Sequence, residues 1–132
     1  MLEFINVIIA GVASFAFGAV WYMSLAEPWK AASGIAVDEN GDPLNQSDPV
    51  PYITSFVASL LVAGMMRHAF VTGGVETFWA GLVSGFGVGA FLVSPWIATF
   101  YAFNSKPLLL VAIDCGYAII GCTIIGAVLM LF

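Results

Sequence analysis

Charged residues are scarce in this sequence. Its 132 residues include three Lys or Arg and eight Asp or Glu, 8% in all, whereas 61% are hydrophobic. Soluble domains carry about a quarter charged residues, and a chain of this length could not cover a water-soluble core with so few. The composition therefore excludes a soluble globular domain and predicts a protein whose partner is the lipid bilayer. The few basic residues form no stripe, so we expect no nucleic-acid partner.

Histidine and cysteine are also rare. His68 is the single histidine, and it falls near the end of a hydrophobic run, so no imidazole is expected in mid-membrane to ligate haem or a catalytic metal. Cys115 and Cys122 are separated by about 10 Å of helical rise, beyond the reach of a disulfide. No nucleophile–base pair, phosphate-binding glycine loop or pair of intramembrane carboxylates can be assembled. We therefore expect no cofactor, no metal site and no enzymatic activity.

Long apolar runs dominate the rest of the chain. About 20 apolar residues in a helix cross a hydrocarbon core of about 30 Å, and the sequence contains four such runs, at about 4–23, 51–71, 76–98 and 108–131. Pro95 and Trp96 mark the expected exit of the third helix, and the polar segment 24–50 is expected to form an extramembrane loop. The sequence thus predicts an all-α integral membrane protein, a single domain over 1–132. Its four transmembrane helices form a compact up-down bundle with both termini on one side.

Small residues recur at i, i+4 spacing in the predicted helices, a pattern that lets helix backbones approach closely in lipid. The favoured interpretation is helix packing and assembly, and pore lining is the alternative. We expect the third helix, which is richest in glycine, to lie centrally or at a subunit contact. The packing residues are Ala10, Ser14 and Gly18 in the first helix, Gly81, Gly85 and Gly89 in the third, and Cys122 and Gly126 in the fourth.

Asp114 lies six residues, or about 9 Å, inside the fourth predicted helix, where a carboxyl group is costly and is a functional candidate by default. It continues the small-residue ridge of that helix and should face protein. One interpretation is a proton or cation site. The favoured one is a buried carboxyl group that fixes helix packing. The residues expected around it, at comparable depth or one turn along, are Tyr22, Ser94, Thr54, Ser55 and Tyr117.

Two parts of the chain carry a family resemblance. The first is Gly-Ala-Val-Trp-Tyr-Met-Ser at 18–24 followed by Pro-Trp-Lys at 28–30, with Asn6 before it. The second is Phe-Asn-Ser-Lys-Pro-Leu at 103–108 and Ile-Asp-Cys-Gly-Tyr at 113–117. Together they resemble the small bacterial membrane proteins grouped as domain-of-unknown-function family 1761, over essentially the whole chain. The resemblance implies a four-helix protein of the bacterial inner membrane and supplies no activity.

The sequence departs from that family pattern at two positions. Asn104 stands where the family more often has an acidic residue, and Ala118 stands where a histidine often follows the tyrosine. The second departure removes a titratable neighbour of Asp114 and weakens a proton relay.

Two functional classes remain open. The first is a non-catalytic accessory or assembly subunit that packs against copies of itself or against a larger membrane complex. The second is a small oligomeric channel or carrier that uses a polar site around Asp114. A single carboxyl group with no basic residue at its depth favours the first class.

Overall fold

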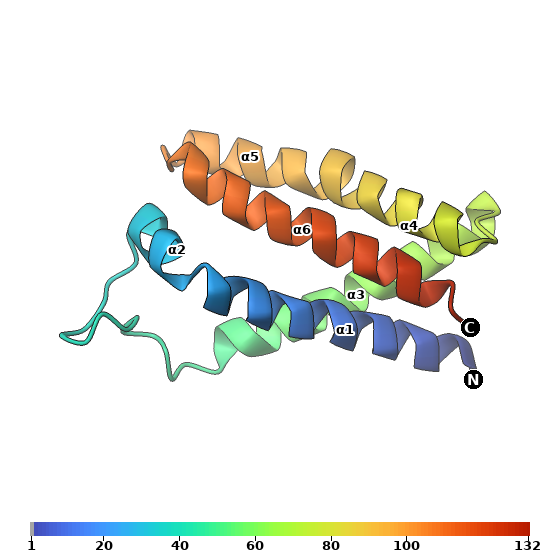
Figure 1. Cartoon of the computed structure of the whole chain (residues 1–132), viewed down its shortest axis with the longest axis horizontal. Helices are drawn as coiled ribbons and strands as arrows, with labels where there is room; N and C mark the ends of the chain where they lie inside the picture. The colour runs from blue at the N-terminus through green and yellow to red at the C-terminus, as the bar shows by residue number, and fades with distance from the viewer. Residues whose placement is uncertain (1) are drawn as a thin grey trace.

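The computed structural model describes residues 2–132, and the elements it contains are helices (Figure 1). In chain order they are α1 (Leu2–Ser24), α2 (Ala26–Ser33), α3 (Val50–Gly73), α4 (Phe78–Gly87), the π-helical η1 (Val88–Val93), α5 (Ser94–Phe103) and α6 (Leu108–Leu129). Because α4, η1 and α5 form one continuous helix, four stretches of the described chain are long and apolar enough to cross a membrane: Phe4–Ser24, Val50–Gly73, Phe78–Phe103 and Leu108–Leu129. The predicted fold class is confirmed.

The third membrane helix is longer than predicted. It continues through Pro95 to Phe103, so the exit expected at 98 is wrong. A proline inside an α-helix meets the carbonyl group four residues before it. Here the preceding turn is π-helical, and Ser94 N–H bonds to Gly89 O, five residues back. This wider turn lets Pro95 begin α5, in the first turn of which a proline is tolerated.

The segment expected as a loop, 24–50, contains the short helix α2. Gly34 ends this helix with φ 69°, a left-handed conformation that glycine adopts without strain, and its N–H bonds to Lys30 O. Pro28 lies in the first turn of α2, where no backbone N–H donor is needed. None of the residues of α2 is buried, and the helix lies at one end of the bundle (Figure 1).

The central element of the bundle is α6, which packs against α1 on one side and against α4, η1 and α5 on the other (Figure 1). The remaining membrane helix, α3, packs against α1 and α6 and leaves a groove between itself and η1–α5. α1 begins and α6 ends at the same end of the bundle, as predicted (Figure 1). Large apolar side chains such as Phe4, Leu61 and Phe91 point outward, as they do toward lipid.

The glycine ridge of the third membrane helix packs against α6 of the same chain. A Cβ atom on Gly85 would collide with Cys122 O, and one on Gly89 would lie 2.6 Å from Ala118 O. Gly81 meets Gly126 in the same way, since a Cβ on Gly81 would lie 2.6 Å from Gly126 O. The seam is therefore buried between two helices of one chain and offers no surface to a second subunit.

The predicted packing residues of α1 are also inside the bundle. Ala10 is fully buried and Ser14 is 4% exposed. Gly18 leaves room for the ring of Tyr117, whose Cε1 atom would lie 2.8 Å from a Cβ at that position. Close approach of α1 to α6 thus depends on small side chains, as the i, i+4 pattern predicts.

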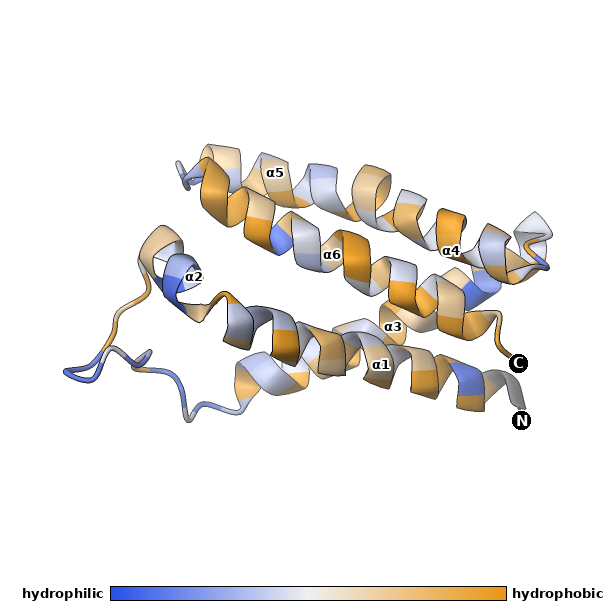
Figure 2. Ribbon diagram, viewed as in Figure 1, coloured by the Kyte–Doolittle hydropathy of each residue, from blue (hydrophilic) through white to orange (hydrophobic). Residues whose placement is uncertain are grey.

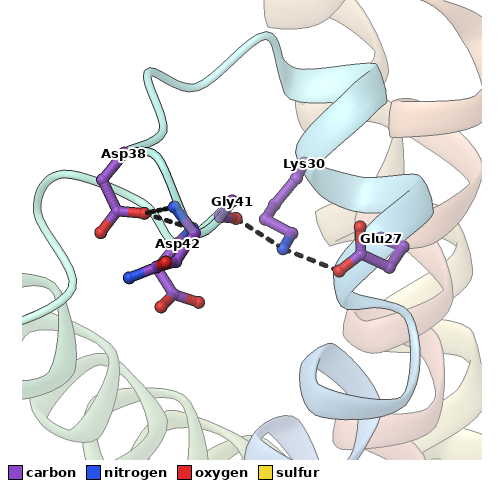
Figure 3. Close-up of polar contacts among 6 residues, drawn as sticks. Glu27, Lys30, Asp38, Gly41 and Asp42 are labelled. Carbon is purple, nitrogen blue, oxygen red and sulfur yellow. Dashed lines mark hydrogen bonds and ion pairs between the residues drawn. The ribbon is translucent and has the colours of Figure 1, made fainter.

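The hydrophilic residues gather mainly in the connection between α2 and α3 (Figure 2). This segment has a defined shape. One carboxylate oxygen of Asp38 accepts from Asn40 N at 2.8 Å and from Asp42 N at 3.0 Å. Lys30 Nζ donates to Gly41 O at 2.8 Å and pairs with Glu27 at 2.8 Å, which ties the segment to α2 (Figure 3).

Candidate functional site

Asp114 is held by two tyrosine hydroxyl groups from two other helices. Tyr22 of α1 donates to Oδ1 at 2.6 Å, and Tyr101 of α5 donates to Oδ2 at 2.5 Å. Both distances lie within the usual range of O–H···O hydrogen bonds, about 2.5–3.0 Å. Asp114 is only 9% exposed, so these hydroxyls replace the water that a surface carboxylate would bind. The site therefore joins α1, α5 and α6.

The helix ends explain why these three side chains meet. Tyr22 lies near the end of α1 and Tyr101 near the end of α5, whereas Asp114 lies in the second turn of α6. Because α6 runs antiparallel to both neighbours, all three positions fall near the end of the bundle that carries α2 (Figure 1). Tyrosine and tryptophan are enriched at this depth in membrane proteins, since their rings are apolar and their polar atoms reach the interface.

Aromatic side chains surround the carboxylate. The Tyr22 ring meets Tyr117 edge-on at 5.4 Å between centroids and Trp29 of α2 at 6.1 Å. Trp21 Nε1 donates to Ile113 O at 3.0 Å, which fixes α1 beside α6 one residue before Asp114. The Trp21 ring fits because residue 116 is glycine, where a Cβ would lie 2.7 Å from Trp21 Cζ2.

The structure brings only part of the predicted cluster to Asp114. Tyr22 donates a hydrogen bond to Asp114. Tyr117 packs against the ring of Tyr22. Neither Ser55 nor Thr54 donates to it: the Ser55 hydroxyl bonds to Tyr52 O, and Thr54 is exposed on α3. Serine and threonine in helices commonly bond to a carbonyl of their own helix, and equal depth does not place two side chains on facing sides.

Ser94 is buried near α6 but does not donate to Asp114 either. Its backbone oxygen lies 3.6 Å from Cys115 Sγ, and its hydroxyl has no hydrogen-bond partner among the described residues. The prediction that Ser94 belongs to the hydrogen-bonded cluster is therefore wrong.

Tyr101 donates a hydrogen bond to Asp114 but is absent from the cluster predicted from the sequence. With the third helix ending at 98, Tyr101 would lie in a loop. In the continuous helix it follows the buried Ser94 by seven residues, two turns along, and faces α6 as Ser94 does. The seven-residue spacing from Ser94 would have placed Tyr101 on the same helix face. The helix end predicted at Pro95 excluded Tyr101 from that helix.

The arrangement offers little for chemistry. Each oxygen of Asp114 already accepts a hydrogen bond from a tyrosine hydroxyl, so the carboxyl group is not presented to a substrate as a free base. Within residues 2–132, no three His, Cys, Asp or Glu side chains are grouped closely enough to hold a metal ion. Cys115 and Cys122 are free thiols. The geometry of these hydrogen bonds links α1 and α5 to α6.

Comparison with known proteins supplies a family but no activity. The family model described as Protein of unknown function (DUF1761) matches residues 5–130, nearly the whole chain. The curated proteins and the solved structures contain no match to this sequence. The match agrees with the resemblance seen in the segments at both ends of the sequence, and the chain belongs to the DUF1761 family.

Proposed function

We propose that this protein is a non-catalytic accessory subunit of a larger assembly in the bacterial inner membrane. The proposal rests on the hydrogen bonds that both carboxyl oxygens of Asp114 accept within the protein. An intramembrane carboxyl group is the first candidate for transport or catalysis. Here both oxygens accept tyrosine hydroxyls at 2.6 and 2.5 Å, an arrangement that supports a structural role.

The segment between α2 and α3 supports a partner outside the membrane. It carries Asp38, Glu39, Asp42 and Asp48, all exposed, and it is held in shape by Lys30 and by the Asp38 turn (Figure 3). Two copies of such a segment would repel each other. Charge complementarity therefore favours a different protein with a basic surface over self-association through this segment.

Native mass spectrometry in a mild detergent tests the proposal. At about 0.05 M salt we expect the chain, of 13.9 kDa, to appear in a larger species with a second protein. At about 0.5 M salt that species should dissociate, because contacts between exposed charges are screened. Glu39→Gln combined with Asp42→Asn should weaken it, since neither carboxylate takes part in the hydrogen bonds that shape the segment.

Glu76→Gln is the matched control, because it removes one negative charge at the opposite end of the bundle and should leave the complex intact. A monomer at both salt concentrations would contradict the proposal. A homo-oligomer that mediates ion flux in liposomes, with the flux lost in Asp114→Asn, would instead support the channel or carrier class.

A further inference from the structure

Two hollows in the membrane part of the molecule lie next to each other and share part of their lining. The lateral groove, about 480 Å³, lies between α3 and η1–α5 and opens sideways; its walls include Val62, Met65 and Met66 of α3 and Leu92, Val93 and Trp96 opposite. The inner cavity, about 160 Å³, lies where α1, α3, η1 and α6 meet. Val62 and Val93 line both hollows, so these two side chains lie between the groove and the inner cavity.

Both hollows have mainly apolar walls, and they differ in the hydroxyl-bearing side chains that line only the inner one. The lateral groove is lined by apolar and aromatic side chains. Apolar residues such as Val62, Val93 and Ile125 also line the inner cavity, but its lining includes hydroxyl-bearing side chains from three helices: Ser14, Ser55, Ser59 and Tyr117. No residue that lines either hollow in the described chain carries a charge.

Ser14 is the group that points to a ligand. It is 4% exposed, it lines the inner cavity, and its hydroxyl makes no hydrogen bond to another described residue. Ser55 and Ser59 differ, because each donates to a carbonyl of α3, Tyr52 O and Ser55 O respectively. A hydroxyl without a partner is unfavourable in an apolar interior, so a bound molecule that bonds to Ser14 would be stabilised.

We propose that the lateral groove and the inner cavity together bind a membrane-soluble amphiphile with an uncharged hydrogen-bonding head. The head, a hydroxyl or carbonyl group, lies in the inner cavity against Ser14, and the apolar chain lies in the lateral groove. A charged head is disfavoured because no lining residue could neutralise it. The cavity volume corresponds to about five water molecules, enough for a head of several heavy atoms.

Photocrosslinking with a long-chain alcohol tests this site. The probe is hexadecanol that carries a diazirine on its chain, added to the full chain in detergent micelles, and mass spectrometry locates the labelled residues. We expect saturable labelling on the groove side of α3 and η1–α5, and competition by unlabelled hexadecanol. Hexadecanoate and hexadecylamine should compete at least about tenfold less well, because their heads are charged.

Two variants separate binding of the head from binding of the chain. Ser14→Ala removes the unpaired hydroxyl and should weaken binding about five- to tenfold, the worth of one hydrogen bond. Val93→Trp places a large ring at a residue that lines both hollows, so it should fill space in both and abolish saturable labelling. Phe91→Trp is the matched control, because Phe91 is 74% exposed on the same π-helical turn and lines neither hollow.

Labelling spread evenly over the lipid-facing surface would overturn the proposal. So would equal competition by the charged amphiphiles, or an unchanged affinity in Ser14→Ala, which would leave the inner cavity to water alone. If Val93→Trp does not fold, the Ser14 variant and the comparison of heads still decide the result.

Discussion

Gly85→Leu is expected to disrupt the packing of α4 against α6 and to destabilise the protein. The first side-chain atom at this position would collide with Cys122 O and lie 3.1 Å from Thr123 Cα. Both neighbours are backbone atoms, so no side-chain rotation can relieve the contact, and the two helices must separate. Overpacking of a core costs about 1–3 kcal/mol and sometimes more. We expect a loss of about 3 kcal/mol or more, measured by thermal or denaturant unfolding in detergent micelles.

Gly87→Leu provides the control on the same helix. A Cβ at Gly87 would meet no atom within 4 Å, so this variant should have the same free energy of unfolding as the parent. Equal stability of the Gly85 and Gly87 variants would show that the seam between α4 and α6 does not hold the bundle together.

Asp114→Leu is expected to destabilise the protein by about 1–3 kcal/mol. The change leaves the hydroxyl groups of Tyr22 and Tyr101 without their acceptor, and an unsatisfied buried donor carries a cost of this size. Most of the loss should come from Tyr22, whose ring is enclosed by Trp29 and Tyr117. The measurement is the free energy of unfolding in the same micelles.

Asp114→Asn should lose much less, because the amide keeps the shape of the side chain and an oxygen acceptor for one tyrosine. The other tyrosine hydroxyl can then accept from the amide nitrogen. If Asp114→Leu were as stable as the parent, the tie between α1, α5 and α6 would have no energetic importance.

Helix number and the side chain of α1 that binds Asp114 could be predicted from the sequence. Runs of apolar residues long enough to span a membrane define the helices, and rise per residue places Tyr22 at the depth of Asp114. Depth does not determine which way a side chain points around its helix. Ser55 and Thr54 lie on α3 at the right depth, yet one bonds to its own helix and the other is exposed.

The other differences come from local rules that longer-range structure overrides. A proline usually ends an α-helix. Before Pro95, however, a π-helical turn allows the helix to continue, and the continued helix brings Tyr101 to Asp114. The glycine spacing predicts a close helix contact and cannot say which helix makes it. The partner of Gly85 is α6 of the same chain, so a contact between subunits must use another surface.

The account depends most directly on the bond between Tyr101 and Asp114, and a double-mutant cycle measures it. Tyr101→Phe, Asp114→Leu and the double variant are unfolded in micelles, with Tyr52→Phe replacing Tyr101→Phe in a control cycle, because Tyr52 is exposed on α3. The account predicts a coupling of about 1 kcal/mol for Tyr101 and about zero for Tyr52. A Tyr101 coupling no larger than that of Tyr52 would contradict the proposed link between α5 and α6 through Asp114.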